Sequence, residues 1–163
     1  MRQFINKFGV PLAVVIIVLA AILAIFSRKS GTIPAIVGDP SLAWYIDEST
    51  GEESVLVFRD NIPPFKGAGG GTLVMACKFQ ADCEKEPITG YLLKYTEDVR
   101  QRGAAFTGDN DQLTELLSTG RLVRSLEPGS PWVSIYSSRA EEITSVPAHS
   151  SGQPRRWVYP KQR

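Results

Sequence analysis

The chain has 163 residues, of which 43% are hydrophobic, and 18 basic side chains stand against 17 acidic ones, for a formal net charge of +1. A balance this even gives no electrostatic attraction toward a phosphate backbone, so we expect no nucleic-acid partner. The residues after position 29 are enough for one domain with a single core, and two independent cores are not expected at this size.

The first 29 residues differ in kind from the rest. Gly9 to Phe26 reads GVPLAVVIIVLAAILAIF and contains no charged, amide or hydroxyl side chain. As a helix with a rise of 1.5 Å per residue, this segment would span roughly 27 Å, close to the ~30 Å hydrocarbon core of a bilayer. The sequence therefore predicts an N-terminal transmembrane helix that binds the membrane lipid bilayer, with residues 1–29 as the anchor.

The flanks of this anchor indicate its orientation. Arg2 and Lys7 precede the apolar segment, and Arg28 and Lys29 follow it, so the positive-inside bias is nearly balanced. The short N-terminal tail and the long C-terminal part are typical of a signal anchor. We therefore expect a single-pass protein of the bacterial inner (cytoplasmic) membrane with its C-terminal domain extracytoplasmic. A cleaved signal peptide, with its site at Ile22 to Ala24, is the alternative.

A linker and a first strand pair follow the anchor. Residues 30–40 carry two Gly and two Pro without hydrophobic periodicity, which is typical of a linker. The β-prone runs Trp44–Asp47 and Ser54–Phe58 flank a polar turn that contains Gly51. This pattern predicts a β-hairpin with a longer loop, and the prolines at 63 and 64 end it.

A second strand pair and two helices are predicted next. The strands are Thr72–Lys78 and Ile88–Tyr95. Thr96 can cap a helix over Glu97–Arg102 that Gly103 ends, and Asp109 or Asn110 can cap another over Asp111–Ser118. With short strands at Leu122–Arg124 and Trp132–Tyr136, residues 41–139 read as an α+β domain with a mostly antiparallel sheet and one or two short helices.

Residues 140–163 read as a polar and basic C-terminal tail that is mostly irregular. Within it, cationic and aromatic residues lie close together, and such a mixture can dock on anionic headgroups or on an acidic protein surface. The alternative is a terminal strand whose aromatic side chains pack on the sheet. The candidate contact residues are Arg155, Arg156, Trp157 and Tyr159.

The two cysteines, Cys77 and Cys83, are candidates for a disulfide, since two thiols this close in sequence would be expected to oxidise outside the cytoplasm. Two free thiols are the alternative. A redox pair of the C-x-x-C type is absent, and a zinc site lacks partners. The one histidine, His149, lies in a polar stretch and reads as an exposed loop residue, which argues against a Cys–His or Ser–His–Asp site.

Other chemical signals are weak. The acidic turn formed by Asp47, Glu48, Glu52 and Glu53 lacks the spacing of a Ca²⁺ loop, and a solvated turn is favoured. The stretch Lys66–Thr72 is rich in glycine but fails the phosphate-loop pattern. We therefore expect no metal, no cofactor and no catalytic residue.

Several short motifs resemble an uncharacterised group of bacterial single-span membrane proteins. They are Trp44–Asp47, the break Ile62–Phe65, the stretch Gly90–Thr96, which reads G-Y-L-L-K-Y-T, and Gly120–Val123. The resemblance implies no activity and transfers no site residue. Pilins share only the outline of an apolar N-terminal helix and a β-rich domain, and the acidic residue expected early in their helix is absent here.

These observations predict a non-enzymatic, membrane-anchored interaction or assembly protein of the cell envelope, with a protein partner or a homo-oligomer. One alternative is an envelope enzyme or small-ligand-binding protein with a carboxylate site, for which a pair such as Asp47 and Glu53 would have to converge. A pilin-like subunit is the other alternative.

Overall fold

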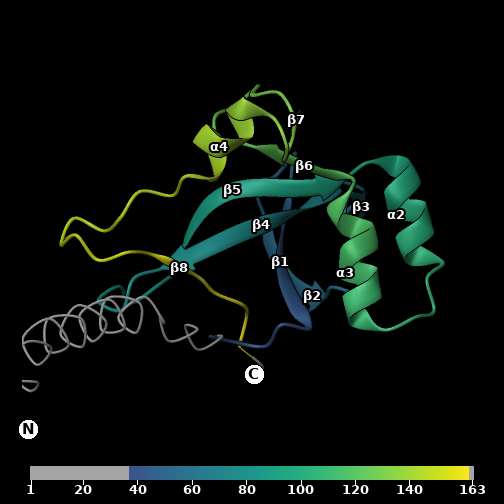
Figure 1. Ribbon diagram of the computed structural model, residues 1–163, viewed down its shortest axis with the longest axis horizontal. Coiled ribbons are helices and arrows are strands. Elements are labelled where there is room, and N and C mark those ends of the chain that lie inside the picture. The colour runs from purple at the N-terminus through teal and green to yellow at the C-terminus, as the bar shows by residue number, and fades with distance from the viewer. Residues whose placement is uncertain (1–36, 162–163) are drawn as a thin grey trace, which may run out of the picture. The chain divides into compact units, whose positions relative to one another are not determined.

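The computed structural model describes residues 37–161, which fold into a sheet-rich α+β domain (Figure 1). The predicted membrane segment Gly9–Phe26 lies outside these residues. None of the helices within 37–161 has the length and apolar character that a membrane crossing needs. The sheet is antiparallel in every strand pair, with the order β2-β1-β4-β5-β6-β7, while β3 and β8 add to β4.

The first hairpin is confirmed. β1 (Leu42–Asp47) pairs antiparallel with β2 (Glu53–Val57), in a register that places Trp44 opposite Val55. The loop between them holds Gly51 at a φ of 74°, a conformation that a side chain disfavours. Hydrophobic alternation and a polar turn were therefore sufficient to place both strands.

The second predicted pair forms the centre of the sheet. β4 (Thr72–Gln80) pairs with β5 (Ile88–Tyr95) and is buried along most of its length. β3 (Phe65–Lys66) forms a short hairpin with the start of β4 across the glycine-rich turn. The pairing of β4 with β5 shifts by one residue after Cys77, so that Gly90 is an extra residue in β5.

Gly90 is a bulge without space for a side chain. A Cβ placed there would lie 2.7 Å from Val146 Cγ2 and 2.9 Å from the Phe79 ring. The next residues of the G-Y-L-L-K-Y-T stretch are also structural, because Tyr91 and Tyr95 are buried in the core. Gly90, Tyr91 and Tyr95 of this stretch therefore have packing roles in the domain.

Both predicted helices form. α2 (Glu97–Ala104) starts after Thr96, although the Thr96 side chain makes no capping hydrogen bond, and it runs through Gly103 instead of ending there. α3 (Asn110–Ser118) is capped by Asp109, whose side chain accepts from the backbone N–H of Gln112. The remaining predicted strands are confirmed as β6 (Arg121–Arg124) and β7 (Val133–Ser134).

The tail is more ordered than predicted. A third helix, α4 (Ser138–Thr144), crosses the expected domain boundary at residue 139 and buries Ala140, with Ser137 as its N-cap. β8 (Arg156–Trp157) then pairs with β4 opposite Gln80 and Phe79. The rest of residues 140–161 carries neither helix nor strand, as expected, and these two elements were not predicted because a helix and a strand this short leave no periodic signal in the sequence.

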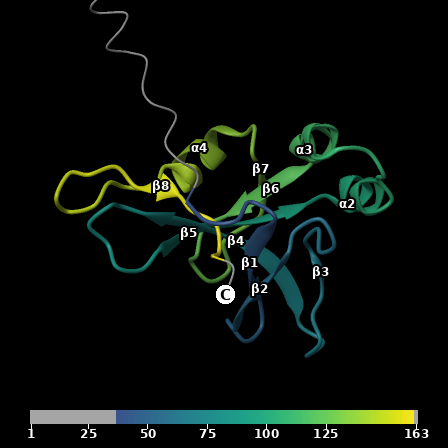
Figure 2. The ribbon, with the colours of Figure 1, turned by 90° about the horizontal axis from the view of Figure 1, so that it is seen from below.

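The helices cover one face of the sheet only. Val99 of α2, Leu113 and Leu117 of α3 and Ala140 of α4 all belong to the same core cluster. Figure 2 shows the three helices on one side of the sheet. Within residues 37–161, no helix lies on the other face, which is called the helix-free face below.

Candidate functional site

One edge of the sheet lies along β2, which has a partner on one side only among the described residues, and the two-residue strand β7 forms the opposite edge. Phe58 N–H donates to Ser41 O, and Asp47 N–H donates to Glu52 O, which fixes where the hydrogen-bonded pairs of this hairpin fall. Because such pairs alternate along an antiparallel ladder, Ser54 and Leu56 bond to β1. The backbone groups of Glu53, Val55 and Val57 therefore point outward at the edge.

The same residues of β2 turn their side chains to the helix-free face. Val55 is 46% exposed and Val57 is 42% exposed, and both are cross-strand neighbours of β1 residues on that face. The edge therefore combines unpaired backbone groups with an apolar surface, which is the combination that favours addition of another strand.

A small apolar cluster lies on the helix-free face beside this edge. Val74, Ala76 and Leu92 are buried there beneath partly buried hydrophobic side chains. The covering residues are Trp44, Ile46 and Trp132. Two tryptophans thus cover the apolar side chains of this face, as the helices do on the opposite face.

Basic side chains extend over these tryptophans. Lys78 Nζ lies 5.4 Å from the Trp44 ring centroid and 2.6 Å from Glu53 Oε2. Lys94 Nζ lies 4.4 Å from the Trp132 centroid. The alkyl stems of such side chains cover apolar surface, while their charged ends stay near water or a carboxylate.

The second tryptophan is stacked by two cations. Arg124 lies 4.7 Å from the Trp132 centroid and forms an ion pair with Glu48 at 3.0 Å. Desolvation lowers the pKa of Lys94, the charge of Glu48 opposes that effect, and the Arg124 charge adds to it. The helix-free face therefore holds a mixed aromatic and charged surface whose cations already have partners.

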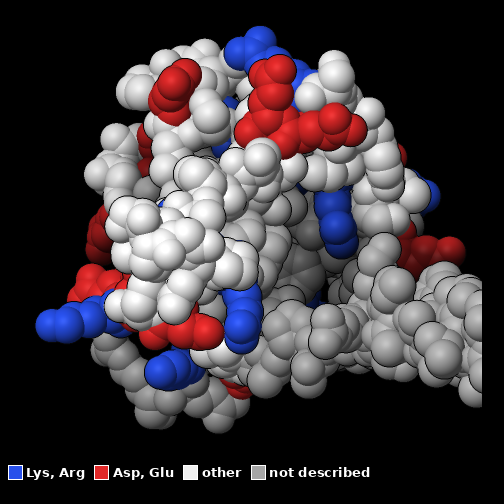
Figure 3. All heavy atoms as spheres, turned by 60° about the vertical axis from the view of Figure 1, so that its left-hand side comes forward, with Lys and Arg blue, Asp and Glu red and all other residues white. Residues whose placement is uncertain are grey.

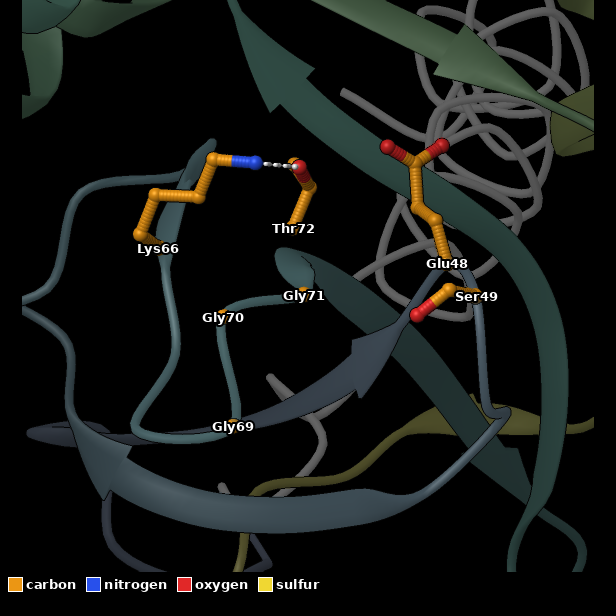
Figure 4. Close-up of a pocket in the computed structure, with 7 residues that line it drawn as sticks. All are labelled: Glu48, Ser49, Lys66, Gly69, Gly70, Gly71 and Thr72. Atoms are coloured by element: carbon orange, nitrogen blue, oxygen red, sulfur yellow. Dashed lines mark hydrogen bonds between the residues drawn. The ribbon is translucent and has the colours of Figure 1, made fainter.

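An open pocket of about 480 Å³ lies at the end of this face. Figure 4 shows Glu48 and Ser49 of the β1–β2 turn facing Lys66 across the pocket, with Gly69, Gly70 and Gly71 at its rim. Lys66 Nζ donates to Thr72 Oγ1 at 3.2 Å. The one carboxylate in the lining, Glu48, is already paired with Arg124, so the pocket offers no converging acids.

The pair of carboxylates that a ligand site would need does not converge. Asp47 accepts from the Ser49 hydroxyl and backbone N–H in its own turn, and these bonds lower its pKa. Glu53 is instead held by Lys78. Across residues 37–161, no group of three or more His, Cys, Asp or Glu side chains is placed to hold a metal ion.

The candidate contact residues of the tail make contacts to the rest of the domain, although Arg156 and Trp157 remain exposed. Arg155 forms an ion pair with Glu84 at 2.6 Å, and Arg156 lies 3.4 Å from Asp82. Trp157 packs edge-on against Phe79 with centroids 5.6 Å apart. Trp157 also contacts Tyr91 and Tyr159. These contacts correspond to the packed terminal strand that the sequence left open as an alternative.

Cys77 and Cys83 are not paired with each other in this structure, which corresponds to the alternative of two free thiols. Cys77 lies on the helix-covered face of β4 with no exposed surface, and burial raises its pKa far above the ordinary value. Cys83 lies beyond the end of β4 and is exposed. A short separation in sequence therefore places the two thiols in opposite environments.

A contact that the sequence did not reveal joins Cys83 to His149. Cys83 Sγ lies 3.4 Å from His149 Nδ1, although the two residues are 66 positions apart. No motif spacing could have signalled this pair, since the pairing of β8 with β4 brings the two loops together.

No protein-family model matches the chain, and no curated protein or solved structure matches it. Figure 3 shows acidic and basic side chains interspersed over one face of the molecule, without a continuous basic area. The site must therefore be interpreted from its own geometry, and the β2 edge with its adjoining helix-free face is the strongest candidate.

Proposed function

We propose that this protein is a membrane-anchored assembly module of the bacterial cell envelope, and that β2 of one copy pairs with β2 of a second copy. The observation that carries this proposal is the free β2 edge, where Glu53, Val55 and Val57 present unpaired backbone groups beside two exposed valine side chains. An edge strand of this kind is a ready template for another strand.

The sequence of β2 suits pairing with itself. An antiparallel pair centred on Val55 would place Val55 opposite its own copy and Glu53 opposite Val57. No like charges then face each other, and each of these pairs would be a hydrogen-bonded one. Glu53 is also neutralised by Lys78 of its own chain, so it does not repel a neighbouring copy.

The predicted anchor adds to this tendency. A transmembrane helix at Gly9–Phe26 confines all copies to one surface and one orientation. Confinement raises the effective concentration of a second copy, which allows a short strand interface to form without high intrinsic affinity. The proposal therefore needs both the anchor and the edge.

Cross-linking of the full-length chain in mild detergent tests this arrangement. In a Cys83→Ser background, Val55→Cys would place two thiols on Cα atoms about 5.5 Å apart, within the roughly 4.4–6.8 Å that a disulfide spans. Leu126→Cys in the same background is the matched control, since Leu126 is 50% exposed and lies away from the edge. We expect rapid covalent dimers from the first variant and slow, concentration-dependent ones from the control.

A second variant tests whether backbone hydrogen bonds at β2 hold the two copies together. Val55→Pro removes an outward N–H but no bond to β1, so the domain should stay folded while the assembly dissociates. Val55→Thr retains the N–H and should leave the assembly intact. A monomer of the unsubstituted chain, together with equal cross-linking of both cysteine variants, contradicts the proposal. A stoichiometric foreign protein that is lost in Val55→Pro would keep the edge as the site but replace the second copy as its partner.

A further inference from the structure

The loop after β4 and the loop before β8 meet at a cluster of polar and nucleophilic side chains. Cys83 Sγ lies 3.4 Å from His149 Nδ1 and 3.7 Å from Ser151 Oγ. His149 Nδ1 also lies 2.9 Å from Ser151 Oγ. The thiol is exposed to solvent, so small molecules can reach it.

A nearly buried ion pair holds the two loops in this position. The Arg155 and Glu84 side chains are 13% and 12% exposed, and the guanidinium makes paired hydrogen bonds to the carboxylate. Arg155 Nη1 also donates to the carbonyl oxygens of Pro147 at 2.7 Å and Ala148 at 3.3 Å. One arginine therefore fixes the residue after Cys83 and the two residues before His149.

The hydrogen bonds around the imidazole define its role. The backbone N–H of Ser151 donates to His149 Nδ1 at 3.2 Å, and a backbone amide can only donate. Nδ1 therefore carries a lone pair in this arrangement, and the proton of the neutral ring is on Nε2. With Nδ1 as an acceptor, the Cys83 thiol and the Ser151 hydroxyl, which both lie within reach of it, act as donors to the imidazole.

We propose that Cys83 and His149 form a thiol-exchange site whose substrate is a small disulfide of the cystine type. Nδ1 of His149 takes the thiol proton, and the Cys83 thiolate attacks one sulfur of the disulfide. The disulfide S–S bond breaks as a new one forms to Cys83. The other half leaves as a thiolate and takes the proton back from the imidazolium. Cys83 is oxidised and one small thiol is released, so atoms and electrons balance.

The product is a lasting mixed disulfide. Cys77, the other cysteine, has no exposed surface and is not paired with Cys83, so it cannot resolve the adduct from within the folded domain. A metal function is disfavoured for the same cluster, since Cys83 and His149 find no third ligand within the described part of the chain. The site thus takes up one half-disulfide per chain until another thiol removes it.

Intact-mass measurement on the full-length protein in detergent tests this proposal. After reduction and desalting, the protein is incubated with cystine at neutral pH, and the adduct is counted over time. We expect one added half-cystine per chain, none in Cys83→Ser, and an unchanged adduct in Cys77→Ala. An adduct on Cys77 of the folded protein, or none on the unsubstituted chain, overturns the assignment of the site.

The role of His149 needs a separate readout. His149→Gln should slow adduct formation by about tenfold or more at neutral pH, since a positioned base accelerates proton removal. At about pH 10, where thiols lose their proton without help, the rate should recover. Arg155 and Glu84, the charged groups beside the pair, stay in place in this variant.

Arg156→Gln is the matched control. It removes a neighbouring cation in β8, whose ion-pair partner is Asp82. We expect its rate to stay within about twofold of the unsubstituted chain, because exposed ion pairs of this kind contribute little. Equal slowing in both variants, or slow reaction of His149→Gln at every pH, would show that His149 only supports the loop.

Discussion

The bulge at Gly90 allows a sharp test of the packing between β5, β4 and the segment after α4. Gly90→Ala would place a Cβ 2.7 Å from Val146 Cγ2 and 2.9 Å from two carbons of the Phe79 ring. Favourable carbon contacts lie near 3.5–4.0 Å, so the new methyl group overlaps its neighbours by about 1 Å. Overpacking of this size costs about 1–3 kcal/mol.

The cost should appear as a lower melting temperature. For a domain of this size, 1 kcal/mol shifts Tm by about 3–5 °C, so Gly90→Ala should lower it by roughly 3–15 °C. Tryptophan fluorescence should change as well, because the displaced Phe79 ring packs against Trp157. Calorimetry and fluorescence-detected melting measure both effects on the same sample.

Two companion variants decide whether overlap is the cause. Gly69→Ala changes a glycine with no atom within 4 Å of its added Cβ and no positive φ, so it should leave Tm nearly unchanged or raise it slightly. Val146→Ala combined with Gly90→Ala should recover part of the loss, giving a coupling energy in a double-mutant cycle. If Gly90→Ala melts like Gly69→Ala, the bulge has room that the structure does not show, and the reasoning fails.

Two ion pairs give further predictions. The hydrogen bond from Arg155 lowers the pKa of Glu84 from 4.5 to about 2, so this pair stabilises the domain fully above about pH 4.5 and ceases to do so as the pH falls toward 2. Hydrogen exchange at β8 should therefore accelerate as the pH falls over that range. The Glu84→Gln variant should lack the part of this pH dependence that protonation of Glu84 causes. Lys78→Met retains volume without charge and should cost less than about 1.5 kcal/mol in urea unfolding. Glu53→Gln leaves a nearly buried ammonium unpaired and should cost about 1–3 kcal/mol, and the reverse order would contradict the burial of Lys78.

The sheet could be predicted where each strand carries its own signal. β1 and β2 alternate around a polar turn, and β4 and β5 are long apolar runs bounded by glycine and proline. The capping signal at Asp109 likewise located α3, because it lies directly before the helix. Local sequence patterns thus predicted most of the strands and helices of the domain.

The features that could not be predicted from the sequence depend on contacts between distant segments. β8 has two residues and forms only because β4 offers an open edge at Phe79 and Gln80. The contact between Cys83 and His149 follows from that pairing and from Arg155, so it has no signature of its own. The two cysteines are unpaired for the converse reason, because nearness in sequence does not determine which face of a strand a side chain occupies.

The start and the end of the described chain are tied together, and this has a mechanical consequence. Val37 forms a parallel bridge with Val158, Tyr159 N–H donates to Val37 O, and Asp39 N–H donates to Pro160 O, both at 2.8 Å. Gly38 permits this approach, because a Cβ there would lie 2.1 Å from Tyr159 O. A pull on the chain before Val37 must rupture these bonds before it can peel β1 from the sheet. The terminal segment thus protects the β1–β2 hairpin from tension that enters the domain ahead of Val37.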